Sequence, residues 1–226
     1  MLLTTDEVEA RILHERDGII AFDKPPDLPT SGRALDDPDC LQWALMQRHG
    51  GMVWAVHQLD ADTSGVNLFT TAKGLVEPLK RAMGHQGATK SYVAIVHGVP
   101  AWEEQACDAP IGLIGQGQLG VAADGRAASS TFRVVARSAE HSVLAVTIAT
   151  GRTHQIRIHS QALGHALVGE EWYRDEPCGL HVRQALHASA LSIAGPHALL
   201  VTAPLPQDLV DLLGRLNLSL GDVVVP

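Results

Sequence analysis

The chain has 226 residues, of which 46% are apolar, and this suits either one large soluble domain or two small lobes that share a core. It contains no run of about 18 apolar residues, and its charged N-terminal segment lacks the apolar core of a signal peptide. We therefore expect no membrane span and a cytoplasmic location. The three cysteines, Cys40, Cys107 and Cys178, are far apart in the sequence and indicate free thiols rather than disulfides or a zinc site.

The net charge of −8 argues against a protein that binds polyanions indiscriminately. The acidity is concentrated towards the N-terminus, because residues 1–72 carry 12 acidic and 5 basic side chains whereas residues 73–183 carry 10 acidic and 11 basic ones. Phosphate binding depends on local clusters of charge rather than on the sum over the whole chain. The middle of the chain is therefore still able to present a local basic surface.

The first half of the chain predicts strands and helices in alternation. We expect a strand at 19–22, a helix at 39–51, a strand at 66–72 and a helix at 74–87. Pro25 and Pro26 end the first strand in an irregular loop. Asp39 is a candidate N-cap for the first helix, which a glycine ends, and Pro78 should limit or kink the second.

The second half is richer in β-type patterns. We expect a strand at 90–98, a hairpin in 128–150 that turns near 139–141, a helix at 151–164, a strand at 184–195 and a terminal helix at 206–217. The strands and helices follow no regular βαβ order, which favours an α+β fold.

The segment "HQLDADTSG", residues 57–65, places two carboxylates, Asp60 and Asp62, just before an apolar run. Such residues are common in turns, where a carboxylate bonds nearby backbone amides. A metal site has little support from the spacing, since His154 and His159 are five residues apart and diverge on a helix. The segment taken alone is compatible with a turn, a metal site or a catalytic carboxylate.

Several segments considered together resemble the RluA-type RNA pseudouridine synthases, which modify large-ribosomal and transfer RNA. "HQLDADTSGVNLFTTAKG" resembles the family's His-Arg-Leu-Asp-x-x-Thr-Ser-Gly motif. Further matches follow in the family's order and cover roughly residues 18–206. They are "AFDKPPDLPT", "KSYVAIVHG", "DGRAASSTFRVV", "TGRTHQIRIHSQALGHALVGEEWY" and "LHASALSI".

The resemblance implies that the protein converts uridine in structured RNA to pseudouridine, with no cofactor and no metal. Asp60 takes the place of the catalytic aspartate, which acts either as a nucleophile or as a base on the ribose. Tyr92 is implied to stack on a uridine flipped out of its helix, and Arg157 to hold Asp60 ionised. Asp62 falls at a variable position of the motif and is expected to serve the turn or the edge of the RNA-binding surface.

The partner is accordingly expected to be ribosomal or transfer RNA. The residues implied to contact it are Gln58, Thr63, Arg152, His154, Lys24 and Lys90, with Arg126 as a possible extension of the same track. Arg152 and His154 open a helix, where backbone amides favour anions. Gln58 stands where the family usually has arginine, and it is neutral and cannot form a bidentate charged fork. Asp27, where the family often has glycine, is a milder departure.

The resemblance also implies the architecture: a pseudouridine synthase fold with a mixed, mostly antiparallel sheet in two lobes that flank a catalytic cleft. We expect residues 1–17 to form an N-terminal extension and residues 18–226 the catalytic domain, which leaves no room for a small S4-type RNA-binding domain before it. Substrate choice would then depend on loops, with 99–125 and 170–185 as candidates. A cleft enzyme of this kind is expected to act as a monomer.

Three functions compete. The first is an active RNA uridine isomerase, indicated by Asp60, Tyr92 and Arg157 in matching motifs. The second is a catalytically weak RNA-binding or RNA-folding module of the same fold, suggested by Gln58 and the acidic balance. The third, a remote alternative, is a metal-dependent hydrolase, which a chelator would inactivate.

Overall fold

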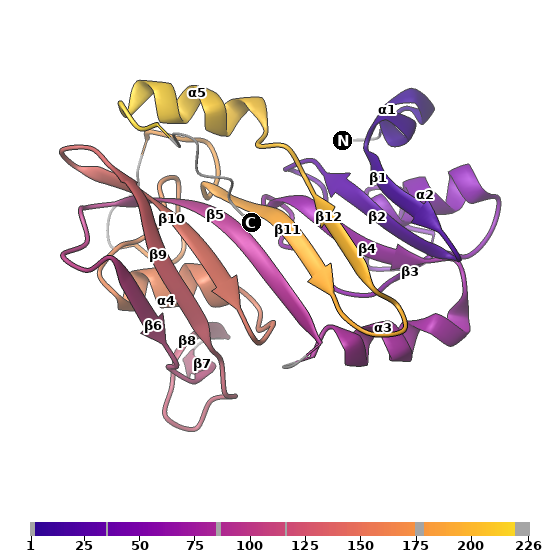
Figure 1. Cartoon of the computed structure of the whole chain (residues 1–226), viewed down its shortest axis with the longest axis horizontal. Helices are drawn as coiled ribbons and strands as arrows, with labels where there is room; N and C mark the ends of the chain where they lie inside the picture. The colour runs from indigo at the N-terminus through magenta and orange to yellow at the C-terminus, as the bar shows by residue number, and fades with distance from the viewer. Residues whose placement is uncertain (1–2, 35, 85–86, 116, 175–178, 220–226) are drawn as a thin grey trace. The chain divides into compact units, whose positions relative to one another are not determined.

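The computed structural model describes residues 3–34, 36–84, 87–115, 117–174 and 179–219. The chain forms two compact units, each built from two separate segments: Met1–Ala88 with Ala188–Pro204, and Thr89–His187 with Leu205–Pro226. Both units combine antiparallel strands with a few helices (Figure 1). The expected α+β class is therefore confirmed.

The first unit is a sheet with the strand order β1-β2-β4-β11, to which β12 adds beside β11 and β3 beside β4. Its strands are β1 (Ile12–Arg16), β2 (Ile19–Lys24), β3 (Trp54–Ala55), β4 (Ser64–Thr70), β11 (Leu186–Ile193) and β12 (Leu199–Thr202). Its helical segments are α1 (Thr5–Ala10), α2 (Leu41–His49), η1 (Lys73–Leu75) and α3 (Val76–Ala82). The strands predicted at 19–22, 66–72 and 184–195 are confirmed as β2, β4 and β11.

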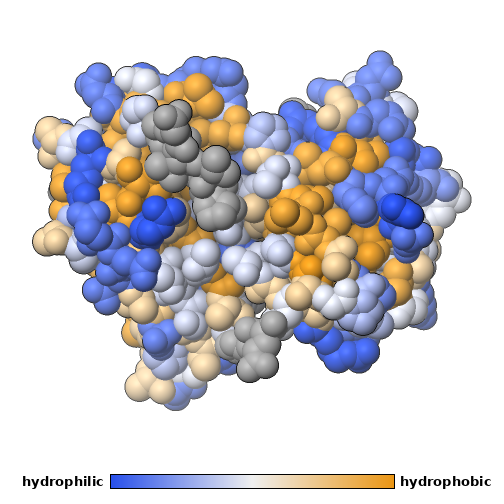
Figure 2. Space-filling view, viewed as in Figure 1, coloured by the Kyte–Doolittle hydropathy of each residue, from blue (hydrophilic) through white to orange (hydrophobic). Residues whose placement is uncertain are grey.

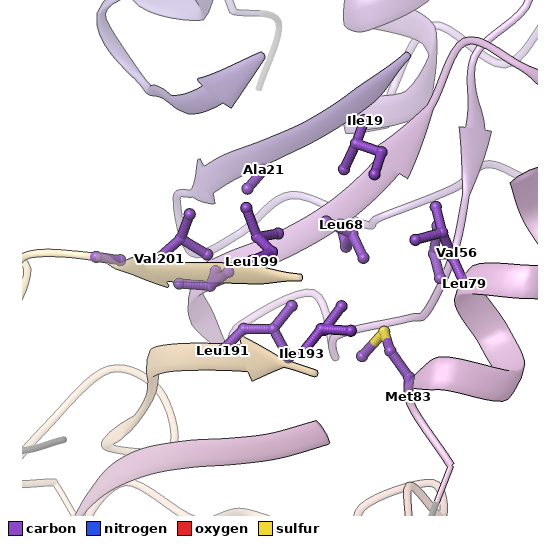
Figure 3. Close-up of a cluster of buried hydrophobic side chains, with 12 residues drawn as sticks. Ile19, Ala21, Val56, Leu68, Leu79, Met83, Leu191, Ile193, Leu199 and Val201 are labelled. Atoms are coloured by element: carbon purple, nitrogen blue, oxygen red, sulfur yellow. The ribbon is translucent and has the colours of Figure 1, made fainter. Parts of the chain in front are cut away.

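Strand β2 separates two hydrophobic clusters because successive side chains of a strand point to opposite faces. Ile19 and Ala21 join a cluster with residues of β4, α3, β11 and β12 (Figure 3). Ile20 and Phe22 join a second cluster with residues of α1 and α2. The uninterrupted apolar run of β2 thus reflects a strand that is covered on both faces.

Two details of the predicted helices need correction. The N-cap of α2 is Cys40, whose Sγ accepts a hydrogen bond from the Trp43 amide at 3.4 Å, and not Asp39. Gly50 ends the same helix in the left-handed conformation, as expected. Pro78 lies in the first turn of α3, where an amide proton has no intrahelical partner anyway, and not in the helix interior.

The second unit is a sheet with the order β5-β10-β9-β6, next to a separate pair, β7 and β8. Its strands are β5 (Ala88–His97), β6 (Glu104–Cys107), β7 (Ile111–Gly115), β8 (Gln118–Val121), β9 (Ser130–Arg137) and β10 (His141–Ile148), and its helices are α4 (Gln155–Ala162) and α5 (Gln207–Arg215). The hairpin in 128–150 is confirmed as β9 and β10. The region 99–125, expected to be loops, contains three short strands.

Helix α5 covers one face of this second sheet. Its leucines, Leu209, Leu212 and Leu213, pack in one cluster with Val93 and Ile95 of β5. Because side chains alternate along a strand, Lys90 and Tyr92 belong to the opposite face of β5. The side chain of Tyr92 therefore lies on the face of β5 opposite to the cluster that contains the α5 leucines.

Other expectations concern the surface and the ends of the chain. Cys40 and Cys107 are buried free thiols, whereas Cys178 lies outside the described residues. In the described part of the chain, every helix is too short or too polar to cross a bilayer. Hydrophobic residues reach the visible surface in separate patches between hydrophilic ones (Figure 2). Residues before 18 contribute α1 and β1 to the first unit, and the domain boundary at 17/18 stays a prediction.

Asp23, at the end of β2, should make stability depend on pH. Burial raises its pKa to about 6 and outweighs the opposing charges of Arg11 and Lys24. A carboxyl whose pKa is higher in the folded than in the unfolded state stabilises the fold at low pH, and this contribution is lost as the pH rises to about 6. Asp23→Asn should therefore stabilise the protein by about 1–3 kcal/mol at pH 7.5 and by almost nothing at pH 4. Urea denaturation of both proteins at the two pH values measures this difference.

Candidate active site

Asp60 lies in the loop between β3 and β4, and its side chain is partly exposed. The loop turns directly after it, where the Thr63 amide donates a hydrogen bond to the Asp60 carbonyl oxygen at 3.0 Å. The backbone on either side of Asp60 is held by two different buried side chains. The carboxylate is therefore presented by a loop whose course is set by the protein.

Lys24 holds the residue after Asp60. Its ammonium donates to the carbonyl oxygens of Pro25, Leu28 and Ala61 at 2.8, 2.7 and 2.6 Å. The side chain is completely buried, and such a charge is tolerated only where its donors are satisfied. Lys24 thus supports the loop of Asp60 from below the surface, and the direct RNA contact expected for it stays a prediction.

Thr30 holds the residue before Asp60. Its hydroxyl accepts a hydrogen bond from the Leu59 amide at 3.0 Å and lies 2.9 Å from Oδ1 of Asn67, to which it donates. The Asn67 amide group in turn donates to the His57 carbonyl oxygen at 3.2 Å. His57 also accepts from the Leu68 amide through Nε2 at 3.1 Å, so its ring proton is on Nδ1. Strand β4 and the loop that precedes it are thereby tied together.

The local backbone geometry requires glycine at position 65 of this motif. Its φ is +107°, and a Cβ added to it would overlap the carbonyl oxygen of Ala188 in the neighbouring strand. We expect Gly65→Ala to destabilise the first unit by at least about 3 kcal/mol, because it combines backbone strain with a backbone clash.

Gly50→Ala is the matched control for this prediction. Gly50 has a φ of +62° with open space around it, so its substitution carries only the conformational cost of about 1 kcal/mol. Thermal melting of both variants compares the two. Equal losses of stability would show that the contact with Ala188 does not constrain residue 65.

Two further residues predicted to contact RNA lie in the same loop. Gln58 is exposed, and its Oε1 accepts a hydrogen bond from the Ser31 hydroxyl at 3.1 Å. Thr63 is only 2% exposed, and its hydroxyl has no hydrogen-bond partner among the described residues. A buried hydroxyl without a partner costs about 1–3 kcal/mol, so Thr63 is an unusual feature of this loop.

The second unit contains Arg157, on helix α4. Its guanidinium donates to both carboxylate oxygens of Glu170, from Nε at 2.8 Å and from Nη2 at 2.7 Å. Both side chains are buried, with 6% and 0% of their surface exposed. Burial would raise the pKa of Glu170, but its hydrogen bonds and the charge of Arg157 bring that pKa below the usual value. The pair is therefore ionised and oriented.

The segment that follows Glu170 wraps around the start of α4. The Arg157 guanidinium carbon lies 5.3 Å from the ring centroids of both Trp172 and Tyr173. The Tyr173 hydroxyl lies 2.7 Å from Nδ1 of His154. His154 occupies the N-cap position of α4 with a φ of +55°.

Buried polar groups attach α4 to the sheet. Gln155 donates to Ser130 Oγ at 2.9 Å and accepts from the Thr150 hydroxyl at 2.7 Å. Nε2 of His159 lies 2.9 Å from the Ala109 carbonyl oxygen, so it carries the ring proton, and Nδ1 accepts from Ser130 at 3.0 Å. Such a network holds the helix, and with it Arg157, in one orientation.

Three basic residues, Lys90, Arg152 and Arg126, form a basic group near the N-terminus of the same helix. Burial, followed by the nearby charge of Arg152, lowers the pKa of Lys90. Arg152 lies near Arg126, whose charge also acts on it, and its Nε donates to the Ala127 carbonyl oxygen at 2.9 Å. Cations so close together repel one another, and an anion between them would relieve this repulsion.

The predicted site residues are thus distributed between the two units. Asp60, Gln58, Thr63 and Lys24 belong to the first unit, and Tyr92, Arg157, Lys90, Arg152 and His154 to the second. Tyr92 is 7% exposed. Within the described ranges, there is no group of three or more His, Cys, Asp or Glu side chains placed to hold a metal ion.

Sequence reasoning missed the supporting residues Thr30 and Glu170. Glu170 stands inside the segment "GHALVGEEWY" that carried the resemblance, so the only available signal was its place in a motif. Of the substrate-selecting region expected at 170–185, residues 175–178 lie outside the described residues.

These features define an α+β protein with an aspartate loop in one unit and an anchored arginine in the other. A family model described as RNA pseudouridylate synthase matches residues 18–162. The chain belongs to this RNA pseudouridylate synthase family, as its motifs predicted.

Known relatives support this assignment. The chain is 33% identical over 195 residues to a dual-specificity RNA pseudouridine synthase, RluA, of Vibrio parahaemolyticus, which covers 82% of this chain and 78% of that protein. It is 38% identical to an uncharacterized RNA pseudouridine synthase of Chloroflexus aurantiacus over 72% of this chain and 53% of that protein. Some relatives are longer, since the chain spans only 41% to 55% of the relatives from Caenorhabditis elegans and Chloroflexus aurantiacus and of one relative, YlyB, from Bacillus subtilis.

The fold has a solved counterpart. The structure of human RNA Pseudouridylate Synthase Domain Containing 4 matches with a TM-score of 0.78 and 24% identity, covering 95% of both chains. The predicted pseudouridine synthase fold is therefore confirmed.

Proposed function

We propose that this protein isomerises uridine to pseudouridine in structured ribosomal or transfer RNA. The observation that carries the proposal is the loop of Asp60, which is held by Lys24 on one side and Thr30 on the other in a chain of this family. A carboxylate held in a set position avoids the cost of ordering it during the reaction. Its partial exposure leaves it open to a substrate.

The reaction breaks the bond between ribose C1′ and uracil N1, turns the base, and joins C1′ to C5. The hydrogen on C5 leaves as a proton, and N1 gains one, so no oxidant or reductant is needed. Asp60 acts either as a nucleophile that attacks the sugar or as a base that removes a proton from the ribose.

Tyr92 and Arg157 have supporting roles in this proposal. Tyr92 stacks on the flipped uracil, and Arg157 serves as the basic partner of the catalytic aspartate. The support for the role of Arg157 is its bidentate bond to Glu170, which restricts the guanidinium to one plane and one direction.

The RNA backbone is bound by the basic group in the second unit. Lys90 and Arg152 pair with phosphates, with help from His154 and Arg126, while Gln58 and Thr63 contact RNA beside Asp60. Lys24 acts as a positioning residue for the aspartate loop. Residues 18–226 form the catalytic domain, which works as a monomer in the cytoplasm without a metal or cofactor.

Product analysis tests the proposal. RNA from cells that lack this gene is incubated with purified protein, separated into ribosomal and transfer fractions, and digested to nucleosides for chromatography. We expect pseudouridine to increase in one fraction with a matching loss of uridine. If neither fraction gains pseudouridine, the proposed function is wrong.

Gln58 favours a second candidate, a catalytically weak RNA-binding module. Its amide is neutral, and its oxygen accepts a hydrogen bond from the Ser31 hydroxyl. This candidate predicts RNA binding without product by the wild-type protein. Under it, the variant Gln58→Arg would gain product formation if the missing charge is what limits the reaction.

A further inference from the structure

Trp172 is a large apolar side chain that is exposed but held in place. It is 61% exposed, whereas Tyr173, the next residue, is only 8% exposed. Its amide donates to Oε1 of Glu170 at 3.0 Å, and its carbonyl oxygen accepts from Nε2 of Gln118 at 3.3 Å. The backbone that carries the indole is therefore fixed from two sides.

The indole itself rests on charged and aromatic neighbours. The buried Arg157 guanidinium lies over its ring with a centroid distance of 5.3 Å. The imidazole of His154 meets it at 5.1 Å with an interplanar angle of 69°. These contacts order the ring while most of its surface remains open to solvent. A ring that is ordered before binding loses little entropy when a partner stacks on it.

The surroundings of the indole favour an anionic partner with flat rings. His154 is two residues from Arg152, and Arg152 lies within the electrostatic reach of Lys90 and Arg126. A nucleobase attached to a phosphate backbone satisfies both requirements, because the base stacks on the indole and the phosphate approaches the cations. An aliphatic peptide segment would satisfy neither requirement.

We propose that Trp172 is the stacking platform for an unpaired nucleobase of the RNA that neighbours the target uridine. The proposal deepens the function proposed above and rests on the role proposed there for Arg157, whose guanidinium lies over the Trp172 ring. Trp172 thereby becomes a determinant of which RNA is bound, through the unpaired base that it requires.

Binding of single-stranded oligonucleotides to four proteins tests this platform: wild type, Trp172→Leu, Trp172→Phe and Trp102→Leu. Loss of one stacked base should weaken binding roughly 10-fold in Trp172→Leu, whereas phenylalanine, which still stacks, should stay within about 3-fold of wild type. Trp102 packs against His165 in the same unit at 5.9 Å and is the matched control, for which we expect unchanged affinity.

Tryptophan fluorescence gives a second readout that a purely structural role would not alter. RNA should quench the emission of the wild type and of Trp102→Leu, and the quenching should be lost in Trp172→Leu and Trp172→Phe. Equal affinity and equal quenching in wild type and Trp172→Leu, with unchanged melting temperature, would overturn the proposal.

The same proteins separate this inference from the proposed function. If the wild type makes pseudouridine but Trp172→Leu has an unchanged KM and unchanged quenching, the platform is wrong and the isomerase stands. If the wild type makes no product but shows quenching that requires Trp172, the isomerase is wrong and base stacking on Trp172 stands.

Discussion

Replacing Asp60 with asparagine should lower the rate of pseudouridine formation by at least about 1,000-fold, because an amide is neither a nucleophile nor a base for this reaction. RNA affinity should stay within about 3-fold of the wild-type value, since the substitution keeps the shape of the side chain. The loop should also persist, because the bonds of Lys24 and Thr30 are made to the backbone of Ala61 and Leu59. Single-turnover kinetics and a binding titration on the same RNA measure the two effects.

Asp62→Asn is the matched control, since it removes the same charge two residues away in the same loop. We expect Asp62→Asn to keep activity within about 5-fold of wild type, because Asp62 is expected to serve the turn or the edge of the RNA-binding surface. The assignment of Asp60 would be wrong if its variant kept the wild-type rate, or if the two variants lost activity equally.

The second large effect concerns stability. Glu170→Ala should destabilise the protein by about 3–5 kcal/mol, because it leaves the buried Arg157 guanidinium without its carboxylate. It also removes the acceptor of the Trp172 amide. We further expect the double variant Arg157→Met with Glu170→Leu to recover most of this stability but none of the activity, since apolar residues can replace a buried ion pair in packing but not in chemistry.

Urea denaturation measures these effects, with Glu103→Ala as the control. Arg137 also bonds both carboxylate oxygens of Glu103, at 3.2 and 2.8 Å, but there the Glu103 side chain is 80% exposed. Removing that pair should cost less than about 1 kcal/mol. If Glu170→Ala cost no more than Glu103→Ala, Arg157 would not depend on Glu170 for its position.

The secondary structure could be predicted from the sequence where the strands and helices are long. Strand β5 has 10 residues, strands β9 and β10 have 8 each, and all three are rich in apolar and β-branched residues, while the leucines of α5 recur at helical spacing. Strands β6, β7 and β8 were missed because they are four or five residues long and contain glycine or exposed polar residues. In addition, β6 pairs with β9, a strand distant in the sequence, and no local pattern contains that pairing.

The site was predictable only in part, for a related reason. The motif singles out Asp60 and Arg157 as candidates, but it could not show which residues support them. From the sequence alone, Lys24 would be expected at the surface, as most lysines are. Only the folded chain brings its ammonium to three carbonyl oxygens. Glu170 pairs with an arginine 13 residues earlier, and that contact requires α4 and the following segment to pack together.

Tritium release tests the central claim most directly. RNA from cells lacking this gene is prepared with uridine labelled at carbon 5, and isomerisation frees that hydrogen to water. The account predicts release by the wild-type protein and none above background by Asp60→Asn. Absence of release by the wild type on every RNA fraction, together with measurable RNA binding, would contradict it and favour the non-catalytic module.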